Sequence, residues 1–249
     1  MPPARVILAC AIRHRHREEH MTRRRRLSVT LGVVAALASA GTALGAVVTP
    51  PAGTPNLALM AIQPSDLTAG AVIGGQNYVT PPTGFTADYG SYFSTSATPD
   101  GVSYYDLEDY VALAPSSTLA NEFIAAETQS VTSHKGRKAF VKASIKQAGK
   151  KAHLVAKDFK FSGAGSMGVG TDSFVETLTI TVKHKKVREV LAWFNVGSVS
   201  ASLLLVGETN EKIPQSDAIL LATAMDTHIN AVLSGATGPS GTTGASGAT

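Results

Sequence analysis

Hydrophobic and polar positions alternate most regularly between residues 172 and 233. In residues 174–182, apolar side chains occupy one side and mainly threonines the other, which is the two-residue period of a strand with one solvated face. The apolar side consists of Phe174, Leu178, Ile180 and Val182, and the opposite side of Val175, Thr177, Thr179 and Thr181. This period predicts a half-buried strand.

Two further strands are expected directly after it. A polar run at residues 183–186 separates the first strand from residues 187–196, in which both faces are apolar. A strand of this kind belongs at the centre of a sheet. Gly197 permits the positive φ of a tight turn, and the alternation resumes in residues 199–206. Connections this short predict a three-stranded antiparallel meander.

A helical period follows the meander. Ser216 is the expected N-cap of this helix, and Gly235 is expected just beyond its last turn, in the C′ position. The apolar positions with helical spacing are Leu221, Met225, Ile229 and Val232. We expect this helix to lie across the meander and to bury one face against it.

The first part of the chain shows weaker forms of the same patterns. The expected strands are residues 72–79, 89–93 (a strand or an ordered loop), 102–114 and 153–161. Gly74 and Gly75 predict a bulge in the first of these, at the edge of the sheet. Residues 98–101 read as a turn and residues 163–170 as a glycine-rich connector.

Two helices are expected between these strands. Ser116 or Ser117 is a suitable N-cap for a helix that ends near Gln129, and a second helix is expected at residues 138–147. Their expected buried positions are Leu119, Phe123 and Ala126 in the first helix and Phe140, Val141 and Ile145 in the second. The whole pattern predicts an α+β fold, an antiparallel sheet packed by helices, in a single domain at residues 57–234.

Residues 1–45 read as a leader. Met21 begins a basic n-region that contains Arg23 to Arg26, residues 27–40 form an apolar h-region, and residues 43–45 supply a small-residue cleavage site. We therefore expect translation to start at Met21 and a secretory signal peptide at residues 21–45.

Two alternatives for this leader remain. The arginines also fit a loose twin-arginine signal, and residues 27–48 are long enough to act as an uncleaved anchor. In each case the domain lies outside the cytoplasm, and the membrane is a partner only if the leader stays uncleaved.

The domain is flanked by two low-complexity segments. Residues 46–56 are rich in Pro and Gly and read as an extended tether. Residues 235–249 have a glycine at every third position, which is the period of collagen. We expect either a disordered tail or a segment that forms a homotrimer. The glycines of this period are Gly235, Gly238, Gly241, Gly244 and Gly247.

Charge is distributed unevenly. The 249 residues have a net charge of +4, but eight arginines lie in the leader, and the remainder carries 14 basic and 16 acidic residues. Nucleic acid is a poor partner for an exported, nearly neutral chain. Residues 135–160 nevertheless hold nine basic residues against one acidic residue. The candidate basic strip consists of Lys135, Arg137, Lys138, Lys142, Lys146, Lys150 and Lys151.

This strip has two interpretations. In the first, it binds an anionic cell-wall polymer, lipid headgroups or an acidic partner. In the second, it is the solvated face of a helix and a strand near the acidic half of the same domain.

The residue pattern lacks a catalytic constellation. Residues 163–168 match the spacing of a dinucleotide-binding loop or, with Ser166, a nucleophile elbow, but a strand rather than a helix is expected next. The four histidines beyond the leader have no metal-ligand spacing, and the only cysteine is Cys10. We therefore expect no catalytic residue, no metal and no cofactor, and hence no enzyme.

Tyrosines and carboxylates cluster in the strand predicted at residues 102–114. Asp106, Glu108 and Tyr110 share a strand face. This combination either suits a sugar or a cation or consists of surface carboxylates beside structural tyrosines, and the second arrangement is the more common one. The candidate ligand-binding residues are Tyr104, Tyr110 and Trp193.

The order of these segments resembles a known group of proteins. Residues 63–70 (QPSDLTAG) open the domain, and residues 168–172 (GVGTD) lead into strands joined at residues 195–197 (NVG) before the final helix. The chain resembles the secreted and extracytoplasmic sensor-like domains of actinobacteria, although Thr68 stands where that group often has Pro. The resemblance implies helices packed on an antiparallel sheet, and it carries no catalytic residue.

Two functions are therefore expected. The first is a secreted, non-catalytic domain that binds a small apolar or amphiphilic ligand or a cell-envelope component. The alternative is a structural or adhesive surface protein whose tail forms oligomers.

Overall fold

The computed structural model describes residues 49–67, 72–97, 103–148, 153–182, 184–207 and 212–235. Its centre is one seven-stranded sheet with the order β1-β2-β3-β7-β6-β5-β4, in which every neighbouring pair is antiparallel. The strands are β1 (Val72–Tyr78), β2 (Ala87–Ala97), β3 (Ser103–Leu113), β4 (Phe159–Gly165), β5 (Ser173–Val182), β6 (Lys185–Val196) and β7 (Val199–Gly207).

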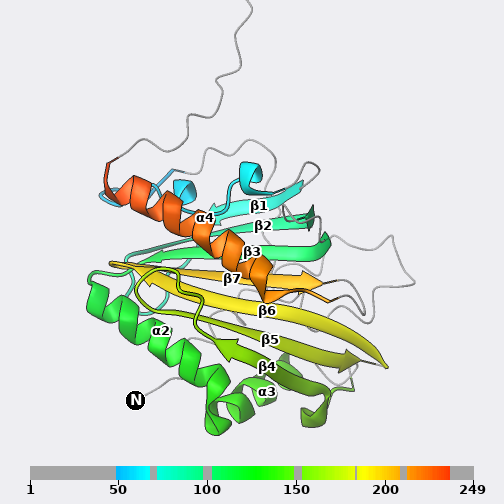
Figure 1. Cartoon of the computed structure of the whole chain (residues 1–249). Helices are drawn as coiled ribbons and strands as arrows, with labels where there is room; N and C mark the ends of the chain where they lie inside the picture. Colours follow the sequence, from blue (N-terminus) through cyan, green and yellow to red (C-terminus); the bar gives the residue numbers. More distant parts are fainter. Residues whose placement is uncertain are drawn as a thin grey trace, which may run out of the picture.

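Helices pack on both faces of this sheet. The long helices are α2 (Ser117–Thr132), α3 (His134–Ala148) and α4 (Gln215–Leu233), and the short 3₁₀ helices are η3 (Leu57–Leu59), η4 (Pro64–Asp66) and η6 (Ala156–Asp158). Figure 1 shows α4 lying diagonally across one face, and α2 and α3 near the β4 edge. The predicted α+β fold with a C-terminal antiparallel meander and a covering helix is confirmed.

Side-chain alternation in β6 separates the two faces. Ala192 and Phe194 point toward α4, where they join a core that includes Leu221, Met225 and Ile229. Their neighbours Leu191 and Trp193 point to the opposite face, where they pack with side chains of α2. β6 is therefore buried on both sides, as its apolar sequence predicted.

Two positive-φ glycines lie where the sequence predicted them. Gly197 has a φ of 58° in the turn between β6 and β7, and Gly235 has a φ of 75° just beyond α4. Both are in the left-handed region that a residue without a Cβ enters at least cost. β1 is an edge strand, and its register shifts between Ile73 and Gly75 as the paired glycines predicted.

Three sequence-based expectations are wrong in detail. The strand expected at residues 153–161 begins only at Phe159, because η6 precedes it, and it continues to Gly165 in the supposed connector. The N-cap of α4 is Pro214 rather than Ser216. Ala126 is exposed, since α2 turns Ala120, Ile124 and Val131 inward instead.

Other expectations fall outside the described residues. These are the turn at residues 98–101, the leader up to residue 48 and the tail beyond Gly235. In the described part of the chain, no helix is long and apolar enough to cross a membrane.

Candidate functional site

The second face of the sheet, opposite α4, is unevenly covered. α2 and α3 pack over β4, β5 and β6 through clusters that include Val141, Phe174 and Trp193. The start of α2 also covers Ala112 near the end of β3. A smaller apolar cluster on β6 and β7, formed by Val187, Leu204 and Val206, contains no side chain from a described helix. This face therefore has a helix-covered half and a half without a described helix.

Carboxylates and tyrosines gather on this second half. We name them the acidic patch: Tyr92 on β2, Asp106, Glu108 and Tyr110 on β3, and Glu189 on β6. Strand register places them together. Asp106 lies opposite Val206 on β7, and Val206 lies opposite Glu189 on β6, so the two carboxylates share one row across three strands.

The carboxylates of the acidic patch are buried. The exposed fraction is 2% for Asp106 and for Glu108 and 4% for Glu189. The Tyr92 hydroxyl donates to Asp106 Oδ1, and the Tyr110 hydroxyl donates to Glu108 Oε2 over 3.3 Å. Buried charged groups are usually hydrogen-bonded or paired, and the two carboxylates of β3 follow this rule, since each accepts from a tyrosine hydroxyl.

Glu189 is the least satisfied member. Its Oε1 atom is buried and accepts no hydrogen bond from any described residue. Burial, together with a smaller effect of the nearby charge of Glu108, raises the pKa of Glu189 to about 8. A carboxylate in this state gains a strong partner when an ammonium or guanidinium group approaches.

Glycines fix the tyrosine rings of the acidic patch. A Cβ atom added at Gly90 would lie 2.7 Å from Cε1 of Tyr110, and one added at Gly74 would collide with the ring of Tyr92. Each ring therefore lies against the backbone of the neighbouring strand. This position holds the two hydroxyls beside the carboxylates of β3.

The predicted ligand-binding residues are only partly brought together. Tyr110 lies opposite Ser202, which lies opposite Trp193, so the tyrosine and the tryptophan occupy one row of the second face. Trp193 is buried under α2, however, and its Nε1 donates to Thr128 Oγ1 over 3.2 Å. Tyr104 belongs to β3, but its side chain is not among those described.

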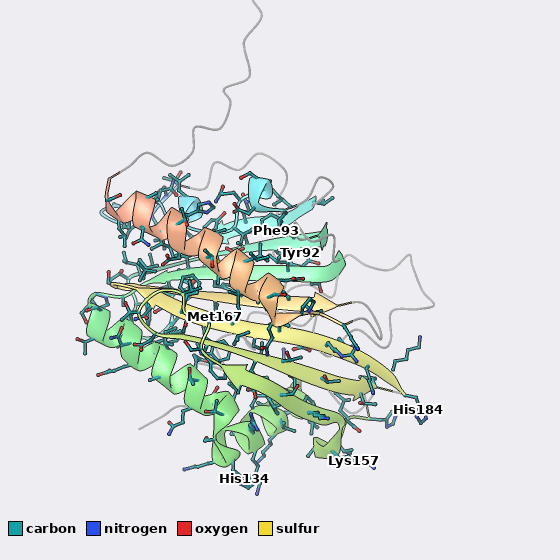
Figure 2. All side chains as sticks on the ribbon, in the orientation of Figure 1. Tyr92, Phe93, His134, Lys157, Met167 and His184 are labelled. Carbon is teal, nitrogen blue, oxygen red and sulfur yellow. The ribbon has the colours of Figure 1, made fainter. Side chains whose placement is uncertain are left out.

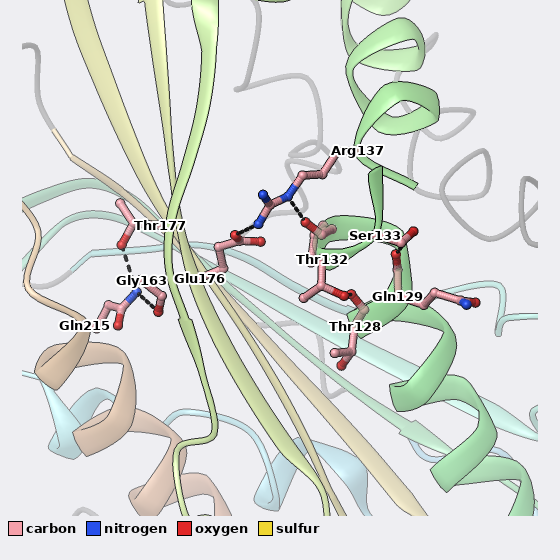
Figure 3. A network of polar contacts seen from close by, with 10 residues as sticks. Thr128, Gln129, Thr132, Ser133, Arg137, Gly163, Glu176, Thr177 and Gln215 are labelled. Atoms are coloured by element: carbon pink, nitrogen blue, oxygen red, sulfur yellow. Dashed lines mark hydrogen bonds and ion pairs between the residues drawn. The ribbon is translucent and has the colours of Figure 1, made fainter. Parts of the chain in front are cut away.

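The predicted basic strip divides into two parts. Arg137 turns toward the sheet, where its guanidinium binds the carboxylate of Glu176 and lies 4.9 Å from the centre of the Phe161 ring. Figure 3 shows this side chain reaching Glu176 on β5 from the first turn of α3. The exposed remainder, which we name the lysine stripe, consists of Lys135, Lys138, Lys142 and Lys146. Lys150 and Lys151 lie outside the described residues.

Figure 3 also shows how β5 links the two faces. Glu176 points to Arg137 on the second face, whereas its neighbour Thr177 points to the α4 face. There the Gln215 amide, in the first turn of α4, donates to Thr177 Oγ1 over 3.1 Å and to the carbonyl of Gly163 over 2.9 Å.

A separate polar cluster lies on the α4 face. Asp109 accepts from the backbone N–H of Ile62 over 3.1 Å and from the hydroxyl of Ser91. Burial raises the pKa of Asp109 to about 7. His228 on α4 meets the Ala61 carbonyl through Nδ1 at 3.1 Å. These contacts hold the segment containing η3 and η4 against the sheet, which is a structural role.

The sequence did not single out Tyr92, Glu176 or Glu189. A signal was present, because each glutamate lies between apolar residues on its strand face: Phe174 and Leu178 flank Glu176, and Val187 and Leu191 flank Glu189. Among the described residues, no group of His, Cys, Asp and Glu is arranged to hold a metal ion.

Comparison with known proteins gives little further information. No family model matches the chain, and no curated protein matches it. Among solved structures, the extracellular domain of PknH from Mycobacterium tuberculosis aligns with 71% of this chain and 98% of its own length, with 13% identity and a TM-score of 0.41. At this TM-score the likeness assigns neither a family nor a function.

Proposed function

We propose that the chain is a non-catalytic extracytoplasmic module that binds an organic cation with an apolar portion at the acidic patch. The leader at residues 1–45 supports the location, and the secreted form is preferred to the anchored one because residues 43–45 offer a cleavage site. The observation that carries the binding role is the buried Oε1 of Glu189, which has no hydrogen-bond partner among the described residues and lies beside the buried carboxylates of β3.

The surroundings of Glu189 favour an amphiphilic ligand over a bare ion. Val187, Leu204 and Val206 form a buried apolar cluster on β6 and β7, beside Glu189. An ammonium group would meet Glu189 and Glu108, while a short hydrocarbon portion would lie on these side chains and gain free energy from burial. The sequence predicted an apolar or amphiphilic ligand, and the carboxylates narrow that proposal to a positively charged one.

Calorimetric titration with hexylammonium tests this proposal. The exported protein is expected to bind it saturably, whereas hexanoate, which has a similar chain and the opposite charge, is expected not to bind. Glu189→Gln is expected to weaken hexylammonium binding by about tenfold, since a charge-assisted contact is replaced by a neutral one. Glu122→Gln, which changes an exposed carboxylate on α2, serves as the control.

Equal binding of hexanoate and hexylammonium would contradict a cation site, and so would an unchanged affinity of Glu189→Gln. A native mass spectrum of the untreated protein adds an independent result. Extra mass would identify a co-purified ligand. A bare trimer that becomes a monomer when residues 235–249 are deleted would support the alternative function, a structural or adhesive surface protein, which the collagen-like period of the tail favours.

A further inference from the structure

The lysine stripe is independent of the acidic patch. Successive members lie three, four and four residues apart in α3, so they share one side of the helix. At a rise of 1.5 Å per residue, the stripe is about 16 Å long with a lysine every 4.5 to 6 Å, roughly. It is therefore a straight row of positive charge one side chain wide.

The helix that carries the stripe is firmly held. Val141 is buried against β4 and β5, and Phe140 and Ile145 pack beside it. Arg137 adds the ion pair with Glu176 on the sheet. The apolar side of α3 thus packs toward the sheet, and the lysines are exposed on the remaining surface of the helix.

The charges of the stripe are not compensated within the described structure. α3 contains no Asp or Glu, and none of the four lysines forms an ion pair with a described residue. Like charges three or four residues apart destabilise a helix. Neutral residues would relieve this repulsion, so the row is better explained by a partner that supplies negative charge.

We propose that the lysine stripe binds a linear polyanion of the cell envelope, a polymer with phosphate or carboxylate groups at regular intervals. Lysine ammonium groups act as point charges and respond to charge density rather than to the geometry of one acidic group. A row of them complements a chain of repeating anions.

The composition of the stripe argues against other anionic partners. Large exposed hydrophobic residues occur among the described residues, but none is on α3, so the helix lacks the apolar side chains that insert into a lipid surface. The stripe also contains no aromatic residue on which a nucleic-acid base could stack.

Binding of the full chain to long-chain polyphosphate and to polyglutamate, measured by fluorescence anisotropy over a series of salt concentrations, tests this proposal. Affinity is expected to fall with salt, with a slope of about −3 in a double logarithmic plot if four lysines each displace a counterion. The variant with Lys135, Lys138, Lys142 and Lys146 all changed to Gln is expected to bind at least ~10-fold more weakly and with a shallower slope.

A second quadruple variant controls for net charge. Lys160, Lys185, Lys186 and Lys212 are exposed residues outside α3, and changing them to Gln removes the same total charge. In Figure 2, His184 marks the tip of the β5–β6 hairpin beside Lys185, well away from His134 at the start of α3. This control is expected to bind the polymers with an affinity within about twofold of the wild type. Circular dichroism should show unchanged helix content in the stripe variant, because Gln is a good helix former, and in the control variant, because its substitutions lie outside the helices.

Three results would overturn the proposal. The first is an equal loss of affinity in the two quadruple variants, and the second is no binding of either polymer. The third is binding to vesicles of anionic lipid that depends on the stripe and is tighter than binding to the polymers. Binding of polyphosphate without polyglutamate would retain the stripe as a polyanion site and identify phosphate as its anion.

Discussion

Buried carboxylates on the two faces of the sheet differ in their hydrogen bonding. On the α4 face, Asp109 has no exposed surface, and it accepts hydrogen bonds from the Ile62 N–H and the Ser91 hydroxyl. On the second face, Glu189 is almost as deeply buried, yet its Oε1 atom accepts no hydrogen bond within the described part of the chain. A satisfied buried carboxylate fastens two segments of the chain together. An unsatisfied one costs stability unless a ligand supplies the missing donor.

The helix-covered half of the second face provides an intermediate case. Glu176 is completely buried like Asp109, but its partner is the charged side chain of Arg137 instead of neutral donors. Desolvation raises the pKa of Glu176, and Arg137 opposes that rise. Asp109, Glu176 and Glu189 are therefore buried to a similar extent but differ in their partners. Substitutions can show how much each kind of partner contributes to stability or to binding.

The largest effect is expected at Arg137. Arg137→Met leaves Glu176 buried without its cation, which is expected to lower the free energy of unfolding by about 3 kcal/mol in urea titrations. Combining it with Glu176→Leu should restore most of the loss, because an apolar pair needs no desolvation of charge. A double variant as unstable as the single one would show that the ion pair is not the source of the effect.

A smaller, pH-dependent effect is expected at Asp109. Its pKa in the folded state is about 7 against an ordinary 3.8, so the folded protein holds a proton that the unfolded chain releases between these values. Stability that depends on this group is therefore present below about pH 4 and lost as the pH rises to 7. Asp109→Asn removes the titration and keeps both contacts, since the amide oxygen accepts from Ile62 and the amide nitrogen donates to Ser91.

We expect Asp109→Asn to be more stable than the wild type at pH 8 by about 2 kcal/mol, with little gain at pH 4. Urea unfolding at the two pH values measures this. Asp172→Asn, at an exposed carboxylate, is the matched control and should show no such pH-dependent difference. A parallel pH profile for Asp109→Asn and the wild type would contradict the raised pKa.

The smallest effect is expected at Gly90. A Cβ atom there displaces the Tyr110 ring, and Gly90→Ala is expected to cost about 1 kcal/mol of stability while weakening the binding of hexylammonium several-fold. Gly165→Ala is the control, because a Cβ atom at that strand position meets nothing within 4 Å. Unchanged affinity in Gly90→Ala would mean that the tyrosine does not contribute to the site.

Local patterns account for most of what the sequence predicted correctly. The period of β5, β6 and β7 and the positions of Gly197 and Gly235 depend on neighbouring residues, so they could be derived without knowing the fold. The start of β4 could not, because the alternation at residues 153–161 is compatible with both a strand and the 3₁₀ turn that precedes Phe159.

The candidate site depends on contacts between distant segments. Asp106 and Glu108 could be placed on one strand face, but their position near Glu189 follows from the β3–β7 pairing, which no local pattern specifies. Similarly, the sequence does not distinguish Arg137 from the neighbouring lysines. Only the fold shows that Arg137 forms an ion pair with the buried Glu176 on β5. Trp193 was predicted to bind a ligand because of its aromatic ring. The sequence pattern did not indicate that α2 would cover this ring.

The strand order also has a consequence for how the chain folds. β1 to β3 and β4 to β7 are each built from neighbours in the chain, and only the β3–β7 ladder joins them. Leu113 pairs with Val199, so this ladder closes a loop of at least 86 residues. Closing such a loop is entropically costly and slow, whereas hairpins form early. The two groups of strands should therefore form before they dock, and the acidic patch, which spans their seam, should be among the last surfaces to appear.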